Sequence, residues 1–285
     1  MKVYNAMTFY VFTKIENENI LSYAKSFCKR AVQLGCRCVS DLKTVEAIDK
    51  DISVFDPSQH TDYVVSIGGD GTMLAAARVA LAHSLPIFGI NAGRIGFLCA
   101  FDKDDISSIT IEDIERLVPS PRALLEVSCG EKFLQYALND VAVTKFNYSR
   151  TVEFELKFGN NSMGTILADG VIAATPTGST GYSLSAGGPI VDPSLESVVV
   201  TSICAHSTFS RGYVLSKNEC VRIIPAKRFK NDFQISVDGD ESMLCPTGTE
   251  ISCRLSERKL NLLVSENRNF YDILFKELSF GRQNR

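Results

Sequence analysis

Three glycines surround one aspartate in the segment from residue 66 to 74, which reads S-I-G-G-D-G-T-M-L. Glycines in a tight turn let backbone N–H groups approach an anion closely, and a helix that starts after the turn favours negative charge at its N-terminus. The carboxylate of Asp70 is unfavourable beside phosphates unless a cation screens it or it accepts a proton from an incoming hydroxyl. The segment therefore predicts phosphate binding with Asp70 as a proton acceptor. A tight turn with a solvated aspartate is the structural alternative.

The glycine turn is predicted to join a strand to a helix. Apolar residues at 63–67 indicate a short buried strand, and those at 73–81 repeat at helical spacing. Thr72 is the candidate N-cap of this helix. The glycine spacing fits neither G-x-x-x-x-G-K-[ST] nor G-x-G-x-x-G, so a P-loop NTPase and a plain Rossmann domain are disfavoured.

A second segment with chemical potential runs from residue 168 to 193 and is rich in Gly, Ser and Thr. So many helix and strand breakers predict an extended loop that lines a ligand, with hydroxyls and amides suited to sugars and amides. Tyr182 offers a flat surface for a heteroaromatic ring. Ser179 and Ser183 both lack the G-x-S-x-G frame of a serine hydrolase. A glycine-rich structural loop is the alternative interpretation.

Length and composition are those of a soluble globular chain of 285 residues, 45% apolar and 22% charged. With 30 Lys and Arg against 33 Asp and Glu, the chain lacks the basic surplus that nucleic-acid binding requires. No stretch is long and apolar enough for a membrane span, and the first residues lack the apolar core of a signal peptide. The nine cysteines are scattered without C-x-x-C, which favours reduced thiols over a metal site. We expect a cytoplasmic protein without nucleic-acid or membrane partners.

The pattern of elements changes along the chain. Strand and helix signals alternate up to about residue 100, which predicts a parallel α/β sheet. From about residue 122 short strands dominate, and strict alternation at 152–158 before a turn at 159–161 predicts a hairpin. The expected elements of the first half are strands at 7–12, 37–42, 63–67 and 86–91 and helices at 20–34 and 73–81. Further strands are expected at 198–203, 221–225, 233–237, 251–255 and 260–264.

Three parts are expected: an α/β nucleotide-binding domain at 1–101, a β-rich domain at 102–264 and a C-terminal segment at 265–285. The tail forms an amphipathic helix over 270–278, whose apolar stripe is predicted to pack on the first domain. The stripe consists of Phe270, Ile273, Leu274 and Leu278.

Several motifs together resemble those of the bacterial-type NAD kinases. They are G-G-D-G-T at 68–72, N-A-G-R-I-G-F-L at 91–98, L-N-D at 138–140, D-G at 169–170, T-P-T-G-S-T-G-Y-S-L-S-A-G-G-P at 175–189, V-D-G at 237–239 and the closing F-Y-D-I-L-F-K-E-L-S-F-G-R. The resemblance implies an ATP:NAD phosphotransferase that uses ATP and Mg²⁺, or another divalent metal, to phosphorylate the 2′-hydroxyl of the adenosine ribose of NAD and produce NADP. It also implies a homodimer or homotetramer.

Roles follow from the resemblance where positions match. Asp70 is the implied general base, and Gly71 keeps the backbone clear for ribose and phosphate. Asn139 and Asp140 match a pair that binds the adenosine of NAD, and Asp169 is expected at the nicotinamide end near the backbone of Leu167. No residue is assigned as a metal ligand. The remaining implied contacts are Arg150, Thr177, Thr180, Gly181, Tyr182, Ser183, Leu184 and Ser185, of which 180–185 form the wall of the site.

The sequence also departs from the family pattern. Asp140 stands where the family has Glu, Gly181 replaces a usual Ala, and Asp240 follows V-D-G where Gln is frequent. His206 lies in a segment without the family's two prolines and is interpreted as a structural histidine. Arg94 either faces phosphate or lies on a surface turn. A G-G-D-G lipid or sugar kinase and a non-catalytic dinucleotide-binding module are the alternatives, although neither kinase class explains residues 168–193.

Overall fold

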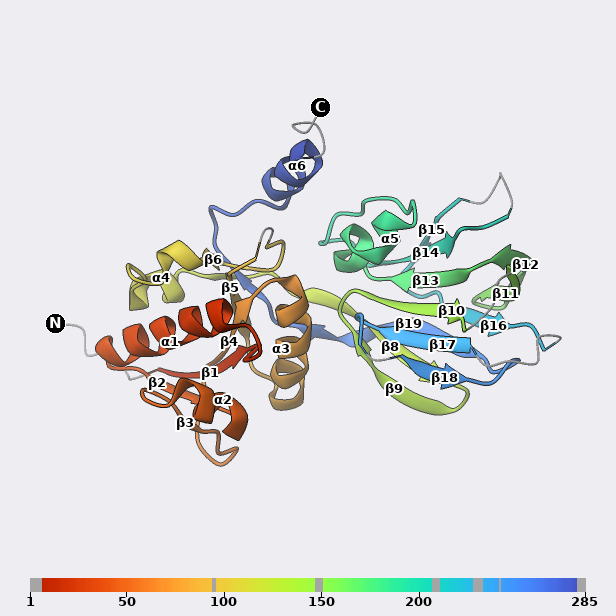
Figure 1. Cartoon of the computed structure of the whole chain (residues 1–285). Helices are drawn as coiled ribbons and strands as arrows, with labels where there is room; N and C mark the ends of the chain where they lie inside the picture. The colour runs from red at the N-terminus through yellow and green to blue at the C-terminus, as the bar shows by residue number, and fades with distance from the viewer. Residues whose placement is uncertain are drawn as a thin grey trace. The chain divides into compact units, whose positions relative to one another are not determined.

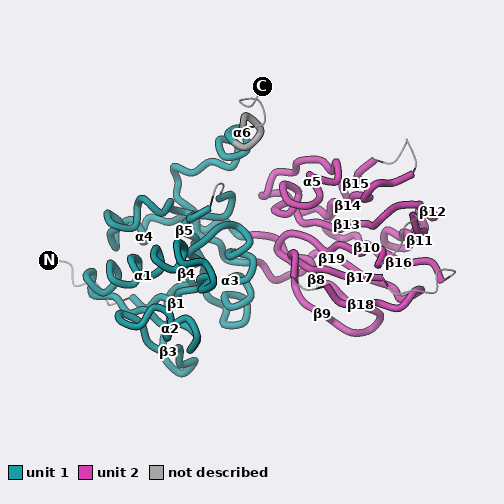
Figure 2. Tube along the Cα trace, viewed as in Figure 1, with its two compact units in different colours: residues 1–121, 260–285 teal, residues 122–259 magenta. Residues whose placement is uncertain are grey.

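The computed structural model of the chain describes residues 7–93, 96–146, 151–206, 211–227, 233–240 and 242–280, with side chains up to residue 276. It divides into two compact units, coloured separately in Figure 2. Unit 1 comprises residues 1–121 and 260–285, and unit 2 comprises residues 122–259.

Unit 1 is built on a six-stranded sheet in the order β3-β2-β1-β4-β5-β6, and its neighbouring strands are parallel (Figure 1). Its strands are β1 Thr8–Thr13, β2 Arg37–Ser40, β3 Ser53–Val54, β4 Tyr63–Gly68, β5 Ile87–Asn91 and β6 Phe101–Asp102. Its helices are α1 Glu18–Gln33, α2 Leu42–Ile48, α3 Asp70–His83, η1 Lys103–Asp105, α4 Ile111–Glu115 and α6 Phe270–Phe280. A short ladder of β7 Val118–Pro119 and β20 Leu263–Val264 completes the unit.

The order of the strands reverses between β1 and β4. The chain moves from β1 through α1 to β2 in one direction, and from β4 through α3 to β5 in the other. Because such crossovers are right-handed, α1 and α3 cover opposite faces of the sheet. Accordingly, Phe9 meets Phe27 of α1 at 5.7 Å between ring centroids, whereas Gly89 lies against Met73 of α3. Ligands of open α/β sheets bind at the carboxyl ends of strands at such a reversal, which is where β4 ends.

The predicted strand at 37–42 is shorter than expected. It ends at Ser40, and Asp41 is the N-cap of α2, with its carboxylate accepting the Thr44 N–H at 3.1 Å. This helix was not predicted from the sequence, because seven residues give too few turns for a clear periodicity. The helix predicted over 20–34 is confirmed as α1.

Unit 2 consists of two six-stranded antiparallel sheets with a shared apolar core. The first has the order β12-β11-β16-β19-β8-β9, and the second β15-β14-β13-β10-β17-β18. The strands are β8 Arg122–Cys129, β9 Lys132–Ala137, β10 Asp140–Lys145, β11 Val152–Phe158, β12 Asn161–Ala168, β13 Gly170–Ala174, β14 Ser197–Ile203, β15 Tyr213–Ser216, β16 Val221–Pro225, β17 Phe233–Val237, β18 Met243–Cys245 and β19 Ile251–Leu260. The expected pairing of a parallel α/β part with a β-rich part is confirmed.

The hairpin predicted at 152–161 is confirmed, since β11 and β12 are joined through Gly159 and pair with Phe158 opposite Asn161. The strands predicted at 251–255 and 260–264 are instead one long strand, β19, followed by the separate short strand β20.

The prediction of one extended loop over 168–193 was wrong in part. Residues 170–174 form the buried central strand β13, and two short helices follow, η2 Thr177–Thr180 and α5 Tyr182–Ser185. The small residues that suggested a loop allow close packing instead. A Cβ at Gly178, for example, would lie 2.0 Å from the carbonyl oxygen of Asn139.

The predicted C-terminal helix is confirmed as α6, and it belongs to unit 1. Phe270 packs on Phe97 at 5.9 Å between ring centroids, and Ile273 and Leu274 are half-buried. The side chain of Leu278, the fourth member of the predicted stripe, lies outside the described residues. On the other face, Phe275 is 73% exposed.

Candidate functional site

The glycine turn of unit 1 lies between the end of β4 and the start of α3. Gly69 is the N-cap residue, so the prediction of Thr72 as the cap was wrong. Thr72 is buried in the first turn, where it packs so closely on Gly68 that a Cβ at Gly68 would lie 2.3 Å from its Oγ1. The glycine at 68 is therefore required by this close approach.

The first turn of α3 has room for an anion. Among the described residues, no atom beyond the immediate neighbours lies within 4 Å of where a Cβ of Gly69 or Gly71 would be. The early N–H groups of a helix have no acceptors within the helix, and its dipole is positive at this end. Open backbone at a helix N-terminus is the arrangement that binds phosphate.

Asp70 is the first residue of α3, and its carboxylate is held in place by backbone. Oδ2 accepts the Phe97 N–H and Oδ1 accepts the Leu98 N–H, both at 3.3 Å. These amides belong to the N-A-G-R-I-G-F-L motif, so the first two motifs of the sequence meet at one carboxylate. Arg94 of this motif lies outside the described residues.

Asn91 and Asp102 hold the rest of the motif. The Asn91 Oδ1 accepts the Gly93 N–H at 3.0 Å, and its Nδ2 donates to Asp102 at 3.1 Å. Asp102 also accepts a hydrogen bond from Arg268, just before α6, at 3.1 Å. The C-terminal segment is thereby tied to the elements that carry Asp70.

In unit 2, the L-N-D and V-D-G motifs are joined by the carboxylate of Asp238. It accepts the backbone N–H groups of Leu138 at 2.8 Å, Asn139 at 2.7 Å and Asp140 at 3.1 Å. Asp238 has a φ of 54°, a left-handed conformation that Asp adopts more readily than most residues. No role was predicted for Asp238, although its carboxylate within the V-D-G motif was the available signal.

Asp140 is buried, with 7% of its surface exposed. Burial and the nearby charge of Asp238 raise the pKa of its carboxyl to about 7, while a hydrogen bond from the Tyr182 N–H opposes the shift. A Cβ at Gly181 would lie 3.6 Å from both Asn139 Nδ2 and Asp140 Oδ2. The L-N-D turn and the Thr/Gly/Ser segment therefore form one wall.

The raised pKa of Asp140 predicts a pH-dependent stability. Its pKa is higher in the folded state than in the unfolded chain, so its contribution is most favourable below the unfolded value of 3.8 and is lost as the pH rises towards 7. We expect Asp140→Asn to have a higher melting temperature than the parent protein at pH 8, because it removes a buried charge. Thermal unfolding of the variant and the parent protein at pH 8 and at pH 5 tests this. The difference between their melting temperatures should be smaller at pH 5. A difference that grows on acidification would contradict the raised pKa.

Some side chains of the Thr/Gly/Ser segment are buried and support its packing, whereas others are exposed. Ser179 exchanges hydrogen bonds with the backbone of Val191, and the fully buried Ser183 bonds to Thr201 at 2.8 Å, so both side chains stabilise the loop. The Oγ1 of Thr177 is buried and has no hydrogen-bond partner among the described residues. Tyr182 is 45% exposed, so its ring is accessible for the predicted packing on a base.

Asp169 does not lie with Asn139 and Asp140 in this unit. It follows β12 and forms an ion pair with Lys145 Nζ at 2.5 Å, at the far end of the β10–β13 ladder. Five residue steps of a strand separate Lys145 from Asp140, which is about 17 Å. Leu167 is near Asp169, and its carbonyl oxygen accepts the His206 N–H at 2.9 Å. Lys145 was not among the predicted site residues.

The other predicted residues are placed as follows. Thr180 and Leu184 are half-buried and Ser185 is exposed. Asp240 closes the turn after β17 through a hydrogen bond from its N–H to the Val237 carbonyl at 3.1 Å. Arg150 lies outside the described residues.

The described residues contain no group of three His, Cys, Asp or Glu side chains that could hold a metal ion. Mg²⁺ at nucleotide sites is usually bound by one or two carboxylates together with substrate phosphates and water. An open glycine turn with one carboxylate fits a metal that is bound jointly with ATP. Among the described helices, none is long and apolar enough to cross a membrane.

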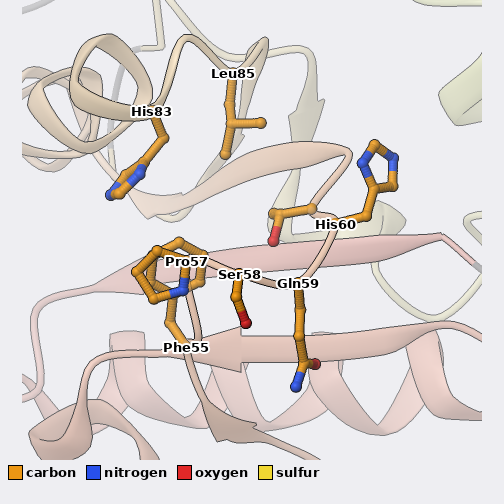
Figure 3. A pocket seen from close by; sticks show the side chains of 8 residues that line it. Phe55, Pro57, Ser58, Gln59, His60, His83 and Leu85 are labelled. Atoms are coloured by element: carbon orange, nitrogen blue, oxygen red, sulfur yellow. The ribbon is translucent and has the colours of Figure 1, made fainter.

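A hollow of about 420 Å³ lies elsewhere in unit 1, beside the start of β4 and the end of α3 (Figure 3). Its lining includes Phe55, His60 and His83, with the His83 ring 4.9 Å from that of Phe55. It shares no residue with the predicted site, which lies at the other end of β4 and α3.

Comparison with known proteins gives the family. Residues 10–116 match the ATP-NAD kinase N-terminal domain and residues 138–265 match the ATP-NAD kinase C-terminal domain. The NAD kinase of Thermoanaerobacter sp. (strain X514) is 35% identical over 225 residues, covering 77% of this chain and 79% of the relative. That of Bacteroides fragilis is 35% identical over 253 residues, covering 86% and 85%.

Two solved structures share the fold. Yeast NADH kinase, solved with NADH, superposes with a TM-score of 0.86 at 22% identity, covering 96% of this chain and 88% of the other. An NAD kinase from Archaeoglobus fulgidus, solved with ATP, has a TM-score of 0.71 at 25% identity, covering 95% and 98%. With its motifs in order on both units, the chain belongs to the ATP-NAD kinase family.

Proposed function

We propose that this enzyme transfers the γ-phosphoryl group of ATP to the 2′-hydroxyl of the adenosine ribose of NAD, with Asp70 as the general base. Family membership supports the coarser statement that the chain is a kinase that phosphorylates NAD using ATP. The observation that carries the proposal is the position of Asp70. Its carboxylate is fixed by two backbone amides at the start of α3, beside the open glycine turn.

The chemistry divides between residues of the two units. The glycine turn offers backbone N–H groups to the triphosphate. Asp70 accepts the proton of the ribose hydroxyl as the new P–O bond forms and the bond from the γ-phosphorus to the bridging oxygen breaks, with ADP as the leaving group. Asn139, Asp140, Thr177 and Tyr182 are proposed to hold the adenosine of NAD, with Asp169 at the nicotinamide end. A divalent metal such as Mg²⁺ would offset phosphate charge when it is bound with ATP. Because phosphoryl transfer depends mainly on positioning, the hydrogen-bonded supports of these residues matter as much as the residues themselves.

A coupled assay tests the function. The purified protein is incubated with NAD, ATP and Mg²⁺, and NADP is detected with an NADP-specific dehydrogenase. We expect NADP formation that depends on both ATP and metal. Binding of NAD without NADP formation would favour a non-catalytic module, and phosphorylation of diacylglycerol in place of NAD would favour a lipid kinase.

The proposal includes a cytoplasmic homodimer or homotetramer. A cytoplasmic location is supported by the cysteines, all nine of which lie within the described residues and none of which forms a disulfide. The oligomeric state rests on the family resemblance, and light scattering after size-exclusion chromatography measures it directly.

A further inference from the structure

Two cysteines of unit 2 bring their sulfur atoms close together from different sheets. Cys129 is the last residue of β8 and Cys245 is the last residue of β18. The two Sγ atoms are 3.8 Å apart, although 116 residues separate them in the sequence. A disulfide has an S–S distance of about 2.05 Å, so the sulfurs need to approach by less than about 2 Å, which is within reach of small side-chain rotations.

Access to solvent at one member is the second feature of the pair. Cys129 is partly exposed, whereas Cys245 is completely buried and belongs to the core between the sheets. Cys28 and Cys38 are neighbours in unit 1, but both are buried, so an oxidant in solution reaches neither. Cys204 is exposed, which makes it a control for general thiol reactivity. Cys220 is also partly exposed and lies near the buried Cys253, so it is a further control for thiol reactivity. Close sulfur contact with one accessible partner is the arrangement of a two-cysteine redox site.

We propose that Cys129 and Cys245 form a reversible redox modification site whose co-substrate is a hydroperoxide. In the first step, the Cys129 thiol attacks the peroxide oxygen; it becomes a sulfenic acid and, with hydrogen peroxide, one water leaves. In the second step, the Cys245 thiol attacks the sulfenic sulfur, the S–S bond forms and a second water leaves. A small dithiol reduces the protein disulfide by thiol–disulfide exchange and is itself oxidised to a disulfide.

The position of Cys129 and Cys245 predicts the effect of a disulfide between them. Cys245 pairs with Phe233 across β17–β18, and Phe233 pairs with Lys145, at the end of β10 away from Asp140. The disulfide would therefore link the two sheets at the end remote from Asp140 and Asp238, which is the end of β10 that carries Lys145 and its ion pair with Asp169. Because it closes a long loop in the unfolded chain, it stabilises the folded state, and it leaves the adenosine-binding wall unchanged.

The direct test is mass spectrometry of the full-length protein. The reduced protein is treated with hydrogen peroxide, its remaining thiols are blocked with N-ethylmaleimide, and it is digested without reductant. We expect a peptide linking Cys129 to Cys245, which disappears after dithiothreitol. The melting temperature of the oxidised protein should rise by about 5 °C.

Three variants separate this site from general oxidation. Cys129→Ser and Cys245→Ala should both lose the linked peptide and the rise in melting temperature, whereas Cys204→Ser should keep both. If Cys245→Ala folds poorly, the peptide from the unsubstituted protein still decides the question. Recovery of Cys245 as a free thiol while Cys129 is a sulfinic acid would overturn the proposal. A linkage of Cys129 to another cysteine would overturn it as well.

Discussion

Asp70→Asn is expected to reduce turnover by roughly 10² to 10⁴-fold while the protein stays folded. Asparagine cannot accept a proton at neutral pH, so it removes the proposed base but keeps nearly the same shape. Its one amide oxygen replaces one of the two acceptors for the Phe97 and Leu98 N–H groups. We expect this loss to cost about 1 to 2 kcal/mol of unfolding free energy, too little to unfold the chain. Steady-state kinetics of NADP formation and a melting curve measure both effects.

The matched control for Asp70→Asn is Asp41→Asn in the same unit. Asp41 is the N-cap of α2, and asparagine is an equally good N-cap, so this variant removes a carboxylate without disturbing a helix start. We expect it to retain normal turnover. Near-normal turnover of Asp70→Asn would refute the general-base assignment, and a large loss in both variants would show that the effect is one of charge or stability.

Asp238→Gly is expected to raise the KM for NAD at least tenfold and to destabilise unit 2 by about 3 kcal/mol or more. It leaves the N–H groups of Leu138, Asn139 and Asp140 without their carboxylate, so the turn that carries the proposed adenosine contacts loses its support. Glycine tolerates the positive φ at this position, so backbone strain does not contribute to the effect. Steady-state kinetics at varied NAD concentration measure the KM, and chemical denaturation measures the loss of stability.

Asp238→Asn separates the hydrogen bonds from the charge. Its side-chain oxygen can still accept the Asn139 and Asp140 N–H groups, which both bond to Oδ1 in the parent protein, and only the Leu138 bond is lost. We expect a destabilisation of about 1 to 2 kcal/mol and an intermediate KM. Glu155→Gln on β11, which removes only a half-exposed ion pair with Lys157, should change neither quantity. Equal effects of Asp238→Gly and Asp238→Asn would show that charge, and not support of the turn, is what matters.

Both Asp238 variants also remove a negative charge near Asp140. The pKa of Asp140 is raised by burial first and by Asp238 second, so it should fall in both variants but remain above 3.8.

Much of the fold could be predicted from local patterns. The alternation of β11 and the turn at Gly159 specified a hairpin, and helical spacing specified α1 and α6. Prediction was wrong where tertiary packing overrode local composition. Residues 170–174 lie in the segment 168–193 that was predicted as a loop from its many Gly, Ser and Thr residues, yet they form a buried strand paired with β10 on one side and β14 on the other. A central strand can contain small residues when its neighbours pack closely, which a single segment does not reveal.

The sequence by itself determined the chemistry of this protein: a glycine turn for phosphate, an aspartate beside it and an ordered series of motifs that identifies the family. These features are local, because a turn and a helix start depend on adjacent residues. Only the tertiary structure decided how distant motifs support one another. It showed that Asp238 holds residues 138–140, that the amides of 97 and 98 hold Asp70, and that Asp169 lies a full strand away from Asp140 in the same unit. Hydrogen bonds between residues far apart in sequence depend on strand order and register, which the whole sheet determines and no local pattern encodes.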